Sequence, residues 1–223
     1  MSERVWTLDV PGAGAVTALL REPPDARGLY VFGHGAGAGM RHAFMDAVAA
    51  RLAGVGVGTL RYQFPYMERG SKRPDARPVL LATVRAAVAA ATAHTDLPLW
   101  AGGKSMGGRM TSLAQAEAPL PGVQRLLFFG YPLHAAGRPS TERAAHLSDV
   151  DVPMLFLQGE RDALGAPALL ASVLAGVHAP ATLHVLAGAD HGFHTRKKDG
   201  RTGEEVLDEA VATFAAWTAG AGS

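Results

Sequence analysis

Cysteine is absent from this chain of 223 residues. Its absence excludes a disulfide scaffold, a thiolate zinc site and a cysteine nucleophile. Aromatic residues make up only 7% of the sequence, so a core must be built mostly from Ala, Val and Leu. Hydrophobic residues nevertheless amount to 48%, which is enough for a globular core and excludes a disordered chain.

The chain also lacks an excess of charge of one sign. It has 21 Lys and Arg against 20 Asp and Glu, which gives a formal net charge of +1. Proteins that bind nucleic acids usually carry a clustered basic excess. The densest basic stretch here, 196–198, is followed by Asp199 and is typical of a solvated loop. We therefore expect no nucleic-acid partner.

Long hydrophobic runs are missing as well. The first twenty residues contain Glu3, Arg4 and Asp9 and no unbroken apolar stretch, so the sequence predicts no signal peptide. No window of about 18 apolar residues indicates a membrane span. These features favour a cytoplasmic protein without a membrane partner, and the length fits one domain over 1–223.

Short apolar runs alternate with longer Ala-rich stretches along the chain. The predicted strands are Arg4–Val10, Ala15–Arg21, Leu29–Phe32, Val55–Tyr62, Leu97–Ala101, Gln124–Phe129, Pro153–Leu157 and Thr182–Leu186. The predicted helices are Arg41–Ala53, Val79–His94, Ser105–Ala116, Ala166–Ala175 and Glu204–Thr218. The turn cluster 11–14 makes the first two strands an antiparallel hairpin, whereas the later strands are apolar throughout, as in a parallel sheet. We predict an α/β fold, a single domain with a mostly parallel sheet of about seven or eight strands and helices on both faces.

The segment 97–110 carries the most informative motif. Gly103, Ser105 and Gly107 stand between a predicted strand and a predicted helix, in the G-x-S-x-G pattern of a nucleophile elbow. The flanking glycines are needed because a side chain two residues from the serine would collide with the turn. Lys104 precedes the serine, and since its side chain points to the opposite side of the strand, we expect it to pair with a carboxylate in a structural role.

A nucleophilic serine needs a base, and the base needs an orienting acid, which follow in the order Ser, acid, His in hydrolases of this architecture. Asp162 and His191 follow the ends of two later strands and are the expected acid and base. Glu160 remains an alternative to Asp162, and His194 an alternative to His191. Because carboxyl ends of parallel strands share one edge of the sheet, we expect these groups to meet there.

A Gly-rich loop, 33–39, follows the first strand of the parallel part. In hydrolases this loop gives one backbone N–H to the oxyanion, and the residue after the nucleophile gives the other. We expect the donors to be Ala36 and Met106, with His34 bracing the loop through hydrogen bonds.

The segment 131–151 follows the predicted strand Gln124–Phe129, at the position where lipases carry a helical cap. Its roughly 21 residues leave room for one short helix, over Thr141–Leu147, and for no cap domain. We expect Phe64, Tyr66 and Tyr131 to form the substrate-binding rim and to cover a short acyl group.

These motifs together resemble the α/β-hydrolase superfamily. The sets 34–37, 103–108, 159–162 and 190–193, with 60–68, are similar to its compact dienelactone-hydrolase-like branch, whose relatives include testis-expressed hydrolase-like proteins. The resemblance covers about 29–217. It implies a serine hydrolase without a cofactor, acting on a small-molecule ester, thioester or lactone. Dienelactone hydrolases themselves have Cys at the elbow where this chain has Ser105, so their substrate does not carry over.

Other classes of function fit the sequence less well. A Walker A loop would need Gly at position 98, which is Pro98. A dinucleotide-binding loop at 33–38 would need an acidic residue about twenty positions later, and none is present. The remaining alternative to a serine hydrolase is a non-catalytic hydrolase-like module that binds a protein partner or a metabolite. No metal site is expected, and the sequence does not determine the oligomeric state.

Overall fold

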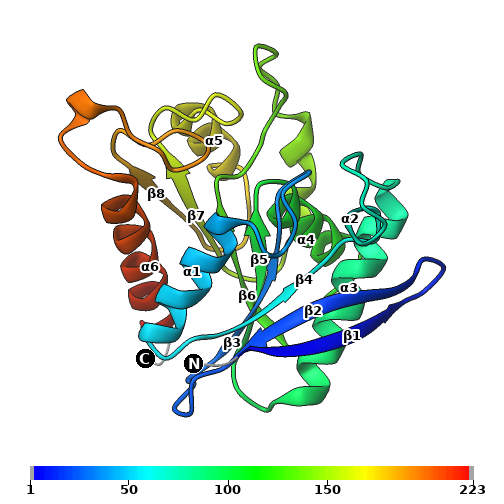
Figure 1. Ribbon diagram of the computed structural model, residues 1–223. Helices are drawn as coiled ribbons and strands as arrows, with labels where there is room; N and C mark the ends of the chain where they lie inside the picture. Colours follow the sequence, from blue (N-terminus) through cyan, green and yellow to red (C-terminus); the bar gives the residue numbers. More distant parts are fainter. Residues whose placement is uncertain (1–2, 221–223) are drawn as a thin grey trace.

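A computed structural model describes residues 3–220 of the chain (Figure 1). Its centre is one eight-stranded sheet, with the strands in the order β1-β2-β4-β3-β5-β6-β7-β8. Strand β2 is antiparallel to both of its neighbours, β1 and β4, and the neighbouring pairs from β4 to β8 are parallel. The strands are β1 (Arg4–Val10), β2 (Gly14–Arg21), β3 (Leu29–Gly33), β4 (Gly58–Tyr62), β5 (Leu99–Lys104), β6 (Val123–Phe129), β7 (Met154–Gly159) and β8 (Ala181–Leu186).

Helices cover both faces of this sheet. The helices are α1 (Ala43–Gly54), α2 (Pro65–Glu68), α3 (Arg77–His94), α4 (Met106–Glu117), α5 (Pro167–Leu174) and α6 (Gly203–Ala219), with 3-10 helices η1 (Glu142–Asp149) and η2 (Lys197–Asp199). Figure 1 shows α1 and α6 side by side on one face and α3 with α4 on the other. The predicted α/β class and strand number are confirmed.

The core lies in two layers, one on each side of the sheet. Helices α3 and α4 bury aliphatic residues such as Val84, Val88 and Met110 against it. Helices α1 and α6 bury an aromatic layer on the other side, in which Phe129 and Phe214 stack at 6.3 Å between ring centroids. Continuous burial of the central strands explains their uninterrupted apolar sequences.

Several element boundaries differ from the prediction. The strand expected from Val55 begins at Gly58, because Val55 and Gly56 form the turn that ends α1. The strand expected to end at Ala101 continues to Lys104 and leads directly into Ser105. Helix α3 begins at Arg77 because Pro78 occupies its first turn, where a missing N–H costs nothing.

The connection between β6 and β7 decides how open the sheet edge is. It contains η1, over Glu142–Asp149, and no cap domain. The short helix predicted over Thr141–Leu147 is therefore present as a 3-10 helix. Within residues 3–220, no helix is long and apolar enough to cross a membrane.

Candidate active site

Ser105 lies in the sharp turn between β5 and α4. Its backbone has φ 50° and ψ −114°, a conformation that L residues rarely adopt. The turn is possible because Gly103 and Gly107 lie close to β3: a Cβ on either would come within 2.4 Å of the Gly33 carbonyl oxygen. Such strain is often found at functional sites, where the surrounding structure maintains it. The segment therefore has the geometry of a nucleophile elbow.

The structure brings Ser105, His191 and Asp162 together. Nε2 of His191 lies 2.9 Å from Oγ of Ser105, and Nδ1 of His191 lies 2.7 Å from Oδ2 of Asp162. The Asp162 side chain is fully buried, so its carboxylate requires donors around it. A carboxylate only accepts, so Nδ1 carries the proton and Nε2 is free to accept one from the serine.

The buried carboxylate of Asp162 receives two further hydrogen bonds. Nε2 of Gln158 donates to Oδ2 at 2.9 Å, and the Leu164 N–H donates to Oδ1 at 2.8 Å. Gln158 is itself held by the Tyr131 N–H and the Gly165 carbonyl. Sequence reasoning missed Gln158, although a glutamine in an otherwise apolar strand was a signal for a buried polar partner.

The two alternative residues have other contacts. Glu160 accepts a hydrogen bond from the Gly188 N–H at 2.6 Å and makes no hydrogen bond with His191 among the described residues. The His194 side chain is 81% exposed, beside Asp190, which caps the turn by accepting from the backbone N–H groups of residues 192 and 194. The geometry therefore favours Asp162 over Glu160 and His191 over His194.

The loop after β3 lies on the other side of Ser105. Ala36 lines a common cavity with Ser105 and Met106, and Met106 opens helix α4, where the first N–H groups have no partner inside the helix. His34 braces this loop: one ring nitrogen lies 2.8 Å from the Gly35 carbonyl oxygen, and the other accepts from the Phe64 N–H at 3.2 Å. Burial lowers the pKa of His34 to about 4, so its ring is neutral at pH 7.

Lys104 does not pair with a carboxylate, and that expectation is wrong. Its ammonium donates to the backbone carbonyl of His191 and lies 5.4 Å and 5.2 Å from the ring centroids of Phe44 and Phe193. Burial lowers the pKa of Lys104 to about 8, although Asp162 and Asp190 oppose the shift. The side chain holds the loop that carries His191 and does not pair with an acid.

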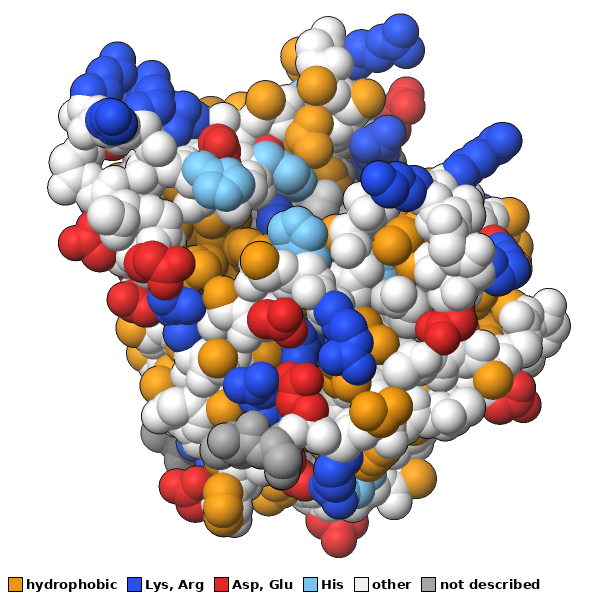
Figure 2. Space-filling view, in the orientation of Figure 1, with side chains coloured by type: hydrophobic (Ala, Val, Ile, Leu, Met, Phe, Trp, Pro, Cys, Tyr) orange, Lys and Arg blue, Asp and Glu red, His pale blue; other side chains and the backbone are white. Residues whose placement is uncertain are grey.

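A cavity of about 530 Å³ opens beside Ser105 and His191. Phe44, Met45, Phe193 and Leu207 make much of its wall apolar, and Lys104 lies at its edge. Its size is within the range of small-molecule sites. Figure 2 shows a hollow with histidine side chains beside it on this face of the molecule.

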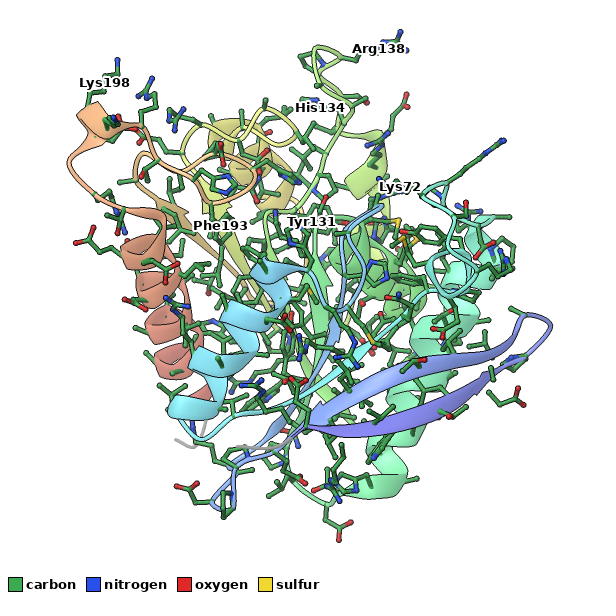
Figure 3. The ribbon with its side chains drawn as sticks, viewed as in Figure 1. Lys72, Tyr131, His134, Arg138, Phe193 and Lys198 are labelled. Atoms are coloured by element: carbon green, nitrogen blue, oxygen red, sulfur yellow. The ribbon has the colours of Figure 1, made fainter. Side chains whose placement is uncertain are left out.

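The predicted rim residues lie elsewhere. Phe64, Tyr66 and Tyr131 are each 0% exposed and border neither cavity at Ser105, so their assignment to the substrate-binding rim is wrong. They pack edge-to-face against β-strand residues and His34 in the core beneath the loops. Both Tyr131 and Phe193, labelled in Figure 3, are buried, but only Phe193 lines the cavity beside His191. A position after a predicted strand does not reveal whether an aromatic side chain lies at the rim of the site or in the core.

Comparison with protein families agrees with this geometry. The model of the family described as an alpha/beta hydrolase domain matches residues 26–219. The chain therefore belongs to the α/β-hydrolase family, as its motifs indicated. A comparison with curated proteins gives no match.

Solved structures share the fold at low sequence identity. A dienelactone hydrolase from Anabaena variabilis is 21% identical with a TM-score of 0.75, over 98% of this chain and 97% of that chain. The esterase domain of a Rhodothermus marinus protein is 16% identical with a TM-score of 0.74, over 98% of both chains. An α/β serine hydrolase without a lid from Xanthomonas campestris is 24% identical with a TM-score of 0.71, over 96% of this chain and 95% of that chain. These likenesses show the compact, lid-free fold.

Proposed function

We propose that this protein is a serine hydrolase that cleaves small carboxylic esters, thioesters or lactones with short acyl parts. The observation that carries the proposal is the continuous hydrogen-bonded path from Ser105 through His191 to a buried Asp162. Such a path activates a serine that is otherwise a weak nucleophile. The chemistry requires no cofactor.

The reaction has two steps. Oγ of Ser105 attacks the carbonyl carbon while Nε2 of His191 takes its proton, and the backbone N–H groups of Ala36 and Met106 stabilise the oxyanion. His191 then protonates the leaving alcohol or thiol as its bond to the carbonyl carbon breaks, which leaves an acyl-serine. Water attacks this ester by the same route in reverse, with His191 as the base, and releases the acid.

Labelling with a fluorophosphonate probe tests the nucleophile. We expect the probe to label the wild-type protein and not Ser105→Ala, and we expect that variant to lose hydrolysis of p-nitrophenyl acetate by about 10³-fold or more. The matched control is Ser172→Ala, because Ser172 lies on α5 and its hydroxyl bonds only the Leu169 carbonyl. A wild-type protein that is neither labelled nor active would instead indicate a non-catalytic binding module.

Acyl length tests the substrate class. Without a cap the site leaves a long acyl chain in water, and each exposed methylene forgoes about 0.8 kcal/mol. We expect kcat/KM to be higher on p-nitrophenyl acetate and butyrate than on palmitate. The highest value on palmitate would contradict a preference for short acyl groups.

A further inference from the structure

A second cavity, of about 410 Å³, adjoins Ser105 on the side away from the base. Met106 and Ser105 line it, but His191 does not, whereas His191 lines the 530 Å³ cavity. The leaving group must receive its proton from His191 and therefore departs on the side of the larger cavity. The smaller cavity remains for the acyl part of the substrate.

Three arginines line this acyl-side cavity. Arg77 comes from the start of α3, Arg109 from the first turn of α4 and Arg143 from η1. The structure gives none of the three guanidinium groups a hydrogen bond or an ion pair with any residue in 3–220. Arg109 stands one turn after the nucleophile, since its N–H bonds the Ser105 carbonyl at 3.1 Å.

The surroundings do not neutralise these charges. Asp75 is the one carboxylate among the described residues lining the cavity: its Oδ1 is paired with Arg69, and its buried Oδ2 has no hydrogen-bond partner. Burial lowers the pKa of Arg109, and the neighbouring charges of Arg143 and Arg77 lower it further. Burial, with Arg109 next, lowers the pKa of His146 to about 4, so that imidazole adds no charge at pH 7.

Unpaired arginines that converge on one partly enclosed space match a ligand with a negative charge. Guanidinium groups bind carboxylates and phosphates through charge-assisted hydrogen bonds, often two at a time. An anion here would also relieve the repulsion that Arg143 and Arg77 exert on Arg109. The larger cavity, with its wall of Phe44, Phe193 and Leu207, suits an apolar leaving group.

We propose that Arg109, with Arg77 and Arg143, selects esters whose acyl chain ends in an anionic group, while the alcohol part is apolar. The proposal rests on the serine hydrolase function and specifies its substrate. The product would then be an acid with two anionic groups, such as a short dicarboxylate. The recognised chemistry is the terminal anion, whether carboxylate or phosphonate.

Four p-nitrophenyl esters with acyl chains of similar length test the proposal. Their chains end in a carboxylate, a phosphonate, a neutral methyl ester and a quaternary ammonium group. At pH 7.5 and low salt we expect kcat/KM on the better anionic ester to exceed that on the neutral ester by about tenfold or more, with the cationic ester slowest. The two anionic esters show which terminal group the cavity prefers. Raising the salt concentration should shrink the preference, because ions screen partly exposed charges.

Charge-removing variants assign the preference to the cavity. In Arg109→Gln the ratio of anionic to neutral kcat/KM should fall about tenfold, and Arg77→Gln and Arg143→Gln should lower it by smaller factors because both residues are more exposed. Arg138→Gln is the matched control, since Arg138 points outward from the tip of the same connection as Arg143 (Figure 3). It should leave the ratio unchanged.

Two outcomes would overturn the proposal while the hydrolase function stands. One is a neutral ester hydrolysed as efficiently as both anionic esters by a protein whose Ser105 reacts with the fluorophosphonate probe. The other is an anionic preference that Arg109→Gln, Arg77→Gln and Arg143→Gln all retain. Absence of both labelling and hydrolysis of every ester would instead contradict the function itself.

Discussion

Nε2 of His34 accepts a hydrogen bond from the Phe64 N–H at 3.2 Å, which joins the loop after β3 to the segment after β4. The contact requires a neutral ring, since a protonated Nε2 would face another donor. The fully buried imidazole has a pKa of about 4, against 6.5 in its unperturbed state.

Acid should therefore weaken the fold through His34. Between pH 6.5 and 4 the unfolded chain binds the proton and the folded one does not, so the free energy of unfolding falls as pH drops through this window, by up to about 1.4 kcal/mol per pH unit for one group. Urea unfolding at pH 7 and pH 4.5 measures this loss, which should be smaller in His34→Gln. The control is His178→Gln at an exposed histidine. Equal pH dependence in wild type and His34→Gln would contradict the expectation.

Replacing Asp162 by Asn should reduce kcat by about 10³- to 10⁴-fold. Both carboxylate oxygens face donors, so the amide NH₂ of Asn would meet either His191 and Gln158 or the Leu164 N–H. With the NH₂ toward His191, Nδ1 must accept, so the ring proton moves to Nε2 and the wrong imidazole tautomer faces Ser105. With the NH₂ toward Leu164, two donors oppose each other and the carboxylate charge is still lost. Asp190→Asn is the matched control, because Oδ1 alone accepts there and an amide oxygen can replace it. Its kcat should stay within about twofold of wild type, and similar losses in both variants would argue against a specific role for Asp162.

Lys104→Met should separate activity from stability. Loss of the bond to the His191 carbonyl should lower kcat by about tenfold to a hundredfold, since it lets the base shift from Ser105. At pH 7 the Met variant should be the more stable, because burial disfavours the ammonium, whose pKa is about 8 against 10.5. Between pH 8 and 10.5 the unfolded chain binds the proton that the folded chain lacks, so wild-type stability should rise toward that of the variant. Chemical unfolding at pH 7 and pH 10 checks the sign, and wild-type-like kcat in the variant would contradict the positioning role.

Gly107→Ala should destabilise the protein by about 1–3 kcal/mol and abolish probe labelling, because its Cβ would lie 2.3 Å from the Gly33 carbonyl oxygen. Gly54→Ala is the opposite case, because Gly54 is the last residue of α1 and no atom lies within 4 Å of an added Cβ. That variant should be neutral or stabilised by up to about 1 kcal/mol. Thermal unfolding of the two variants measures the difference. A smaller loss of stability in Gly107→Ala than in Gly54→Ala would contradict this prediction.

The sequence was informative wherever a short-range rule determined the outcome. The G-x-S-x-G turn, the order of Ser105, Asp162 and His191, and apolar runs of strand length each follow from local sterics or from the shared edge of a parallel sheet. The side on which a large aromatic lies depends on packing among distant segments. That is why Tyr66 and Tyr131 were expected at the rim and are in the core. The same limit applies to Lys104, whose acceptor lies 87 residues away.

The two cavities at Ser105 share only Ala36, Ser105 and Leu164 among the described residues that line them. Under the proposed ester hydrolysis, a substitution at Leu207 would therefore affect contacts with the alcohol part, and one at Arg143 would affect contacts with the acyl part. In this proposal the site consists of two half-sites that meet at Oγ of Ser105. Selectivity for the acyl part and selectivity for the alcohol part could then change independently during evolution. A mutant library could likewise randomise the lining residues of one cavity and leave those of the other cavity unchanged.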